Sequence, residues 1–427
     1  MAADLSGAGR AAATAATAAV TAATVVPFGA DATPGEPTLR WVGQATSVPG
    51  IERELGRIWS HPQAPAARGE AQERPGAART SVLNLVVVAD TPEFGEQAAA
   101  TLAAGTGRHP SRTLILVPID PDGPAWLRAD VKAYCMVPRP GAPETCAEQV
   151  FVLAGGETGR HLQAIVAPLL VHDLPVTVWW PGDPAFGAEL THALVGMADR
   201  LVVDGSGWSG DGLDRLRALA GLARASLPIS DFALMRQARW REAVASIFDR
   251  DDLLPYLRSL RSIMVTYASP GRSETEAPTN LVKPLYHAAW LGSRLGLAVG
   301  RPLERVGRGA EAGQDLRALL ARPRGADVQV GLRPVVSSAP GGTTLQVEVL
   351  AERRGSELRA EVTAAAEIVR GRAWRDGVAV LDRTFHAVRR TDADLLAEAI
   401  EAGGRDPVAE ETLAMAAGLA GPGAAAG

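Results

Sequence analysis

Residues 81–119 read SVLNLVVVADTPEFGEQAAATLAAGTGRHPSRTLILVPI, and this stretch decides how the chain folds. The run Ser81–Ala89 is short, apolar and β-branched, which is typical of a strand buried on both faces. Residues 90–93, DTPE, indicate a helix start with proline in the first turn, and the predicted helix is Glu93–Ala104. A second apolar run, Arg112–Ile119, follows. A strand, a helix and a strand at this spacing predict a parallel, right-handed βαβ unit.

The same alternation of strand and helix continues outward from this unit to Ile229. Further strands are predicted at Val131–Val137, Ala147–Leu153, Val176–Trp180 and Arg200–Val203, and helices at Ile51–Trp59, Thr158–Leu170, Phe186–Met197 and Leu213–Ala225. This pattern predicts an α/β N-terminal domain with an open, mixed, mostly parallel sheet and flanking helices.

The character of the chain changes after Ile229. Ser230–Asp249 and Pro278–Gly300 are predicted as helices, and Arg301–Arg324 as a linker with a helical turn. Strand-like segments separated by turns follow at Ala326–Val336, Thr343–Ala351, Glu357–Ala365 and Val378–Leu381, before a last helix at Asp392–Ala402. This half therefore reads as an α+β C-terminal domain with an antiparallel meander.

The domain organisation follows from these changes in composition. We expect a disordered Ala/Thr-rich tail at 1–38, the α/β domain at 39–228, the α+β domain at 229–404, and a C-terminal helix and flexible tail at 405–427. A surface loop rich in Pro, Ala, Gly and charge is expected at 61–79.

Composition narrows the function classes. The 427 residues carry a net charge of −5, which argues against a general nucleic-acid binder. Lys132 and Lys283 are the only lysines among 43 basic residues, which we interpret mainly as a coding bias. No apolar run reaches the roughly 18–20 residues that a membrane span needs, and the N-terminal alanines lack a signal peptide's apolar core. The sequence predicts a cytoplasmic protein without a membrane partner.

Metal and redox chemistry have little support in the sequence. Cys135 and Cys146 are too few for a Cys₄ zinc site or an iron–sulfur cluster, and they flank a hairpin loop almost symmetrically. They form a candidate redox pair, although two reduced, buried thiols are the usual state in the cytoplasm. His161 and His172 stand eleven residues apart on one helix, about 16 Å along its axis, so they cannot share an ion. We expect no catalytic, cofactor-binding or metal-binding residues.

A glycine-rich loop keeps one enzyme alternative open. Gly205–Gly210, GSGWSG, has the form G-x-G-x-x-G between a strand and a helix, and Asp231 lies 21 residues after Gly210. The segment before Asp231 is short and contains proline, and Trp208 would crowd a phosphate. The alternative function is a nucleotide-binding enzyme or sensor that uses this loop.

Three residues are candidates for contacts with a protein partner. Trp179 and Trp180 fall on opposite faces of a strand that ends at Pro181, so one of them could be an exposed anchor and the other core, or both could be core. Arg112 stands at a strand start, where it could bind an anion or a partner carboxylate, or belong to an ordinary loop.

Four segments, in order, resemble the glucose-6-phosphate dehydrogenase assembly proteins, the OpcA family. They are Leu169–Phe186, LLVHDLPVTVWWPGDPAF; residues 108–112, RHPSR; Ile229–Asp249, ISDFALMRQARWREAVASIFD; and Ala288–Leu297, AAWLGSRLGL. The late helix after the meander fits as well, so the resemblance spans roughly residues 80–400. Ala289 stands where the family usually has glycine, and the long N-terminus and the 61–79 loop depart from the usual short start.

The resemblance implies a non-catalytic protein that binds glucose-6-phosphate dehydrogenase and favours its active oligomer in the oxidative pentose phosphate pathway. Photosynthetic members link that enzyme to thioredoxin through cysteines. This chain has only two cysteines, so the resemblance does not extend to that redox role. The sequence therefore predicts an assembly factor and allosteric activator, with Arg112, Trp179 and Trp180 as its interface candidates and no cofactor. Its own oligomeric state is left open.

Overall fold

The computed structural model describes residues 24–25, 33–60, 78–79, 81–105, 108–140, 144–225, 227–271, 278–310 and 313–422. The chain divides into two compact units. The first contains the chain up to Asn84 together with Thr91–Leu174, and the second contains Leu85–Asp90 and the chain from Pro175 onward.

The first unit is built on a mixed sheet. Its strands are β1 (Thr24–Val25), β2 (Thr38–Ala45), β3 (Ala78–Arg79), β5 (Ser111–Ile119), β6 (Trp126–Met136) and β7 (Thr145–Gly155). They are hydrogen-bonded in the order β1-β2-β6-β7-β5, and β3 pairs with the start of β7. The pairs β5–β7 and β3–β7 are parallel, while β6–β7 is the antiparallel hairpin that the sequence predicts.

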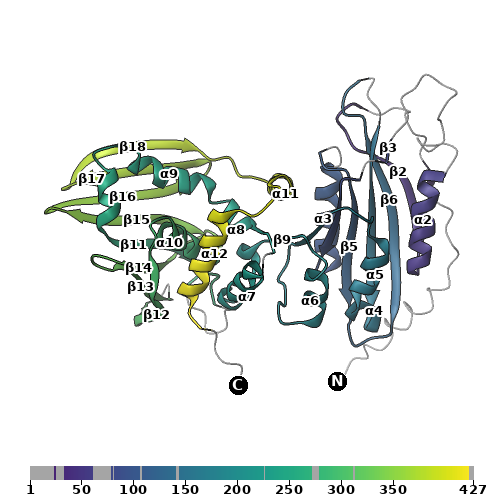
Figure 1. Ribbon diagram of the computed structural model, residues 1–427, viewed down its shortest axis with the longest axis horizontal. Coiled ribbons are helices and arrows are strands. Elements are labelled where there is room, and N and C mark those ends of the chain that lie inside the picture. Colours follow the sequence, from purple (N-terminus) through teal and green to yellow (C-terminus); the bar gives the residue numbers. More distant parts are fainter. Residues whose placement is uncertain are drawn as a thin grey trace, which may run out of the picture. The chain divides into compact units, whose positions relative to one another are not determined.

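Four helices cover this sheet: α2 (Val48–Ser60), α3 (Pro92–Ala104), α4 (Gly156–Arg160) and α5 (Leu162–Leu169). Helix α2 packs on β2 and β6 and contacts α5, while α3 packs on β5 and β7 (Figure 1). Helix α3 begins where the sequence indicates, because the Thr91 side chain accepts the Phe94 N–H and Pro92 occupies the first turn. Gly95 lets α3 approach the sheet, since an added Cβ would lie 2.9 Å from Val117.

The second unit contains the apolar strand β4 (Leu83–Val88) from Leu85 on, and the short strands β8 (Val176–Trp180), β9 (Arg200–Val203) and β10 (Ile229–Asp231). The order is β4-β8-β9-β10, and β8–β9 and β9–β10 are parallel. Between and after these strands lie α6 (Glu189–Val195), the 3-10 turn η3 (Gly205–Gly207), α7 (Leu213–Arg224), α8 (Phe232–Met235) and α9 (Ala238–Phe248).

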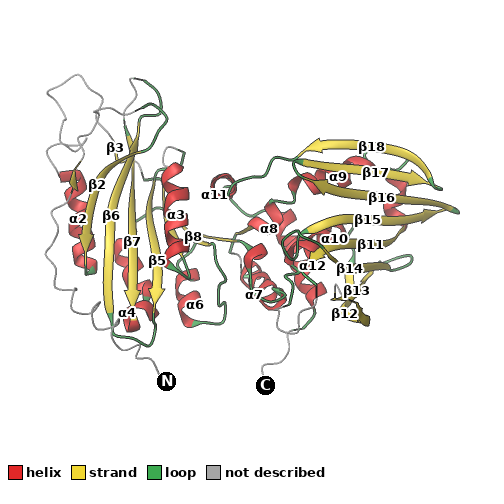
Figure 2. Ribbon diagram, turned by 180° about the vertical axis from the view of Figure 1, so that it is seen from behind, coloured by secondary structure: helices red, strands yellow, loops and turns green. Residues whose placement is uncertain are grey.

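A second sheet completes this unit. Its eight strands have the order β12-β13-β14-β11-β15-β16-β17-β18, and consecutive hairpins join β15 through β18 (Figure 2). They are β11 (Leu260–Ser269), β12 (Ala298–Ala310), β13 (Gly313–Ala321), β14 (Val328–Val336), β15 (Thr344–Arg353), β16 (Ser356–Ala365), β17 (Ile368–Arg375) and β18 (Val378–His386). Every neighbouring pair is antiparallel except β11–β14.

Helices pack on this sheet at several places. Helix α9 lies on β16, β17 and β18, and α10 (Val282–Arg294) lies on β11, β14 and β15. Helix α12 (Pro407–Ala420) packs against α10 and α7, and the 3-10 segment η4 (Leu254–Ser259) contacts β15. Helix α11 (Asp392–Glu401) contacts α8.

The predicted fold classes are confirmed, with a mixed, mostly parallel α/β part and an antiparallel meander. Several element predictions are wrong, since β2 was not predicted and the helix predicted at Ser230–Asp249 is divided into the end of β10, α8 and α9. The segment 301–324 is not a linker but belongs to β12 and β13, the helix at 278–300 ends at Arg294, and β17 was not foreseen. Charged residues interrupt the alternation in all three strands, and β12–β13 pairing has register shifts that break the pattern further.

Other predictions lie mostly outside the described residues. These are the tail at 1–38, apart from β1 and residues 33–38, and the loop at 61–79, apart from β3. The end of the chain from 423 also lies outside them. The four-part domain division stays a prediction, and the two compact units divide the chain at other positions.

Candidate functional site

Four aspartates stand at or just after the ends of strands in the second unit. Asp90 follows β4, Asp183 follows β8, Asp204 follows β9, and Asp231 ends β10. Because the carboxyl ends of parallel strands meet at one edge of a sheet, and binding sites of α/β proteins lie there, this group is the first place to look for function. We call these four residues the strand-end cluster.

Asp231 is the most buried member, with 5% of its surface exposed. Its Oδ1 accepts the backbone N–H of Gly205 at 2.9 Å and of Ala233 at 2.8 Å, and its Oδ2 accepts the Tyr286 hydroxyl at 2.7 Å. Burial raises the pKa of the Asp231 carboxyl from 3.8 to about 6, and the hydrogen bond from Tyr286 opposes this rise. Burial and the facing carboxylate raise the pKa of Tyr286 well above its ordinary value.

The glycine-rich loop Gly205–Gly210 uses its polar groups within the chain. The Gly205 N–H is held by Asp231, and Asp204 Oδ1 accepts the backbone N–H and the hydroxyl of Ser206 at 3.1 and 2.6 Å. Asn280 Nδ2 donates to the carbonyl oxygens of Gly205 and Trp208. A phosphate needs these N–H groups free, and two carboxylates occupy them instead.

The remaining geometry of the loop also differs from a nucleotide cradle. Trp208 is buried and meets the Phe186 ring edge-on, with ring centroids 6.1 Å apart. An added Cβ at Gly205 would lie 2.8 Å from Asp231 Oδ2, so this glycine accommodates the acid of the chain itself. The alternative function, nucleotide binding at Gly205–Gly210, is therefore not favoured.

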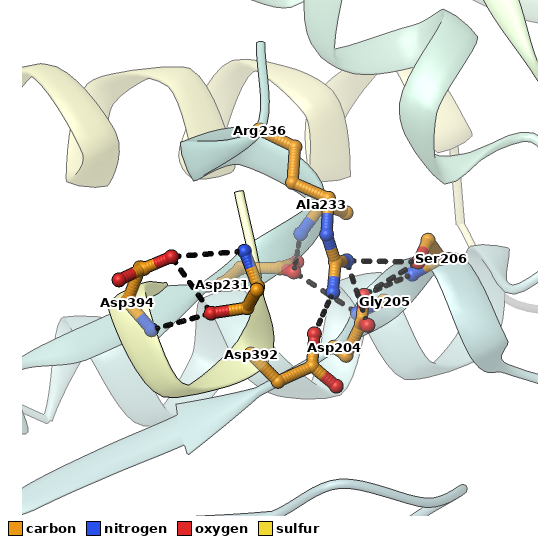
Figure 3. A network of polar contacts seen from close by, with 9 residues as sticks. Asp204, Gly205, Ser206, Asp231, Ala233, Arg236, Asp392 and Asp394 are labelled. Atoms are coloured by element: carbon orange, nitrogen blue, oxygen red, sulfur yellow. Dashed lines mark hydrogen bonds and ion pairs between the residues drawn. The ribbon is translucent and has the colours of Figure 1, made fainter. Parts of the chain in front are cut away.

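Arg236 ties the strand-end cluster to the last part of the chain (Figure 3). Its two terminal nitrogens contact Asp204 Oδ2 and Asp392 Oδ1, each at 2.7 Å. Asp392 is the first residue of α11, which begins at a capping box formed by Thr391 and Asp394. The arrangement holds α11 near the end of β9, and both ion pairs of Arg236 join residues of the same unit.

The other half of the cluster fixes the turn after β8. Asp90 accepts the backbone N–H of Asp183 at 2.9 Å and the indole N–H of Trp180 at 3.4 Å. Asp183 in turn accepts the Ser209 hydroxyl at 2.6 Å and forms an ion pair with Arg215. These contacts make the cluster a positioning network for loops.

The three residues predicted to contact a partner are buried. Trp179, Trp180 and Arg112 expose only 2%, 5% and 8% of their surfaces. The structure therefore has no exposed tryptophan anchor at the end of β8. Trp180 donates a hydrogen bond to Asp90, and the Trp179 ring packs near Phe232. Their role in partner binding stays a prediction, through positioning of the surface around them.

Arg112 brings two of the quoted motifs together in the first unit. Its Nε contacts Glu148 Oε2 at 2.6 Å, and its Nη1 donates to the Leu169 carbonyl at 2.9 Å. Arg112 and residues 168–172 line a pocket of about 580 Å³ beside α2. Asn84 holds the same segment, since its side chain bonds the backbone of Val171 at both N–H and carbonyl.

Cys135 and Cys146 are directly opposite each other on β6 and β7, as their positions around the hairpin suggest. The structure joins them in a disulfide, with Cα atoms 4.0 Å apart, so the expectation of two reduced thiols is wrong for this structure. Trp59 of α2 packs against the pair. Whether the pair is redox-active stays a prediction.

Sequence reasoning missed most of the network. Asp204, Tyr286 and Asn280 are not among the sequence-based candidates, whereas Asp231 is named only as the acid that follows the glycine-rich loop. It also missed His287 on α10, whose pKa burial lowers to about 3, with the charges of Arg241 and Lys283 acting in the same direction. Two sequence signals indicate the network: the five-residue spacing of Asp231 and Arg236, and the glycine-rich loop Gly205–Gly210 before them.

Within the described ranges, no three His, Cys, Asp or Glu residues are grouped as a metal ion would need. No helix in the same ranges has the length and apolar character to cross a bilayer.

Comparisons with known proteins bear on this architecture. A model described as the glucose-6-phosphate dehydrogenase subunit N-terminal domain matches residues 103–220, and one described as its C-terminal domain matches residues 227–413. The chain belongs to the OpcA family. The resemblance predicted from the four segments is confirmed.

Curated relatives agree with this membership. A protein of Nostoc punctiforme, provisionally named OxPP cycle protein OpcA, is 26% identical over 210 residues, which cover 47% of this chain and 43% of that protein. Its namesake from Synechocystis is 25% identical over 202 residues, covering 47% and 40%. The chain thus aligns with less than half of the length of these OpcA relatives.

Solved structures resemble the chain only distantly. A dehydrogenase from Chromobacterium violaceum is 12% identical with a TM-score of 0.43, over 80% of this chain and 94% of that one. Myo-inositol dehydrogenase from Lactobacillus casei is 10% identical with a TM-score of 0.40, over 79% and 93%. At these scores the likeness carries no argument about function.

Proposed function

We propose that this OpcA-family chain is a non-catalytic, cytoplasmic assembly factor that binds glucose-6-phosphate dehydrogenase and favours its active oligomer in the oxidative pentose phosphate pathway. The observation that carries the proposal is the match of two family models, in order, to residues 103–220 and 227–413. Both models are described as domains of a glucose-6-phosphate dehydrogenase subunit.

The strand-end cluster supports a positioning role over catalysis. Asp231, Asp204 and Arg236 form hydrogen bonds with backbone and side chains of their own unit. These bonds fix the loop after β9 and the start of α11. An activator needs surfaces held in one shape, because it acts by binding one state of its partner more tightly. A coupling of about 1–3 kcal/mol changes an affinity roughly 5–150-fold.

We further propose that the surface around Arg112 in the first unit and, separately, the surface at the end of β8 in the second unit contribute to the partner contact. The segment Leu169–Phe186 connects the two places in sequence. Since Arg112, Trp179 and Trp180 are buried, we expect them to act by holding this segment in shape. We also propose that redox control of the chain acts through the pair Cys135–Cys146.

The experiment is co-purification of the full chain with the dehydrogenase of the same organism, followed by light scattering and by kinetics with and without the chain. We expect a complex and a change in kcat, KM or oligomeric state. The absence of both a complex and any kinetic change would reject the function. Repeating the kinetics with reductant tests the cysteine pair.

Variants locate the contact. Arg112→Ala and Trp180→Ala should weaken the complex, whereas Arg128→Gln, an exposed arginine on β6, should not. Circular dichroism of each variant separates lost binding from lost folding. If both buried-site variants fold and bind like the unchanged chain, the placement of the contact is wrong while the function stands.

A further inference from the structure

Five arginines surround one pocket at the end of the second sheet. The pocket has a volume of about 800 Å³ and lies wholly within the second unit. We call it the arginine pocket. Its charged lining consists of Arg258, Arg294, Arg322, Arg324 and Arg353, and the lining contains no acidic residue.

The sheet topology explains why residues so far apart in sequence meet here. Strand β11 starts at Leu260, directly after Arg258, and its antiparallel neighbour β15 ends at Arg353. Strand β14 starts at the same edge because it runs parallel to β11, and β13, antiparallel to β14, therefore ends there, just before Arg322. Strand ends thus gather these arginines without any local sequence motif.

Acids near the pocket are already engaged. Glu411 pairs with Arg294, and Glu352 pairs with Arg261, which does not line the pocket. Asp327 accepts the backbone N–H of Arg322 at 3.4 Å. By contrast, the side chains of Arg258, Arg324 and Arg353 form no ion pair with any residue that the structure describes, so the pocket carries uncompensated positive charge.

Arg322 gives the pocket a preorganised donor. Its Nη1 donates to the carbonyl oxygen of Arg258, which fixes the guanidinium. Its Nε and Nη2 are buried and have no hydrogen-bond acceptor among the described residues. A guanidinium fork of this kind matches the spacing of two oxygens on a phosphate.

Apolar side chains form the rest of the wall. Leu254, Pro255, Leu257 and Leu295 line the pocket, and Leu254 is 51% exposed. Small-molecule sites typically combine a volume of about 300–1,000 Å³ with an apolar lining and a few polar groups. The pocket therefore suits a small molecule that joins a multiply charged anionic group to a carbon skeleton.

We propose that the arginine pocket binds a phosphorylated small molecule, with Arg322, Arg258 and Arg324 holding the phosphate oxygens and the leucines contacting the carbon skeleton. A phosphate is favoured over a carboxylate because it offers more charge and more acceptor oxygens to several guanidinium groups. The site goes beyond the proposed function, since it concerns the chain alone and does not depend on the dehydrogenase.

The test is isothermal titration calorimetry on the full chain at low ionic strength with three probes: inorganic pyrophosphate, ATP and glucose 6-phosphate. We expect saturable binding of at least one probe. The double variant Arg258→Gln/Arg324→Gln, which changes exposed side chains, should weaken that binding at least tenfold. Arg128→Gln, in the first unit, should leave it unchanged. Thermal unfolding curves verify that all variants fold.

The three probes distinguish the source of the phosphate. Preference for ATP indicates a nucleotide, preference for glucose 6-phosphate indicates a sugar phosphate, and equal binding of all three indicates recognition of the phosphate alone. The proposal is overturned if no probe binds saturably, or if the double variant binds as tightly as the unchanged chain. It is also overturned if the double variant loses only a protein partner, because the pocket would then serve an acidic protein segment.

Discussion

Replacing Asp231 by asparagine should remove one pH dependence of stability and leave the hydrogen bonds in place. The asparagine Oδ1 can still accept the N–H groups of Gly205 and Ala233, and its Nδ2 can donate to the Tyr286 hydroxyl oxygen. The variant therefore isolates the charge of one buried carboxylate.

The magnitude follows from the raised pKa. In the folded chain the Asp231 carboxyl titrates at about 6, against an ordinary value of 3.8, because burial disfavours its charged form. Between these values the folded state binds more protons than the unfolded state, so stability falls as the pH rises from about 4 to about 6. At about 1.36 kcal/mol per unit of pKa, ionisation of Asp231 costs about 3 kcal/mol of unfolding free energy above pH 6.

Urea unfolding at several pH values between 4 and 7.5 measures this effect, followed by tryptophan fluorescence. Six of the nine tryptophans lie in the second unit, so the signal reports mainly on the unit that holds Asp231. The stability of Asp231→Asn relative to the unchanged chain should rise by about 3 kcal/mol across this range. A difference that does not vary with pH would refute the reasoning.

A companion variant tests the same argument from the other side. Tyr286→Phe removes a hydrogen bond that lowers the pKa of Asp231. The pH range over which stability falls should therefore extend upward. If it moves downward, the Tyr286 hydroxyl does not stabilise the carboxylate.

Three further predictions concern single contacts. Gly205→Ala should lower the unfolding free energy by about 1–3 kcal/mol, because its Cβ would lie 2.8 Å from Asp231 Oδ2. The control Gly207→Ala, whose Cβ would have nothing within 4 Å, should change it by less than about 0.5 kcal/mol. Equal urea midpoints for the two variants would contradict this prediction. Reduction of Cys135–Cys146, whose positions differ by 11, should lower the unfolding free energy by about 3 kcal/mol; thiols that alkylate before any reductant is added would refute the bond. His287, with its pKa lowered to about 3, contributes stability above pH 6.5 that is lost as the pH falls towards 3; a protonated imidazole in proton NMR of the folded chain at pH 5 would disprove it.

The elements that sequence predicts best are short, wholly apolar and closely bounded. Strands β8 and β9 have the expected ends, because proline or polar residues flank runs whose every side chain is buried. Strands β12, β13 and β17 were not predicted because charged side chains interrupt their apolar residues, with three arginines each in β12 and β17 and with Asp315 and Arg317 in β13. The hydrophobic pattern of a sequence predicts a strand buried on both faces more readily than a half-exposed strand with charged side chains.

The site was harder to predict because its contacts are non-local. The G-x-G-x-x-G pattern was visible, but the fact that Asp231 and Asp204 hold its N–H groups depends on how β9 and β10 align. The arginine pocket is similar, since its residues come from four strand or helix ends spread over about a hundred residues. The excess of arginine was visible in the composition, but its concentration at one edge was not.

The contact between Arg236 and Asp392 also sets an order of events during synthesis. The two residues are 156 positions apart, and the whole meander lies between them. A nascent chain that has reached Arg236 can already form the contact with Asp204, but the second acceptor is added only after eight more strands have been made. Closing so long a loop costs entropy that the folded meander must offset. The docking of α11 is thus a late step, and chains that stop short of it leave Arg236 without its contact to Asp392.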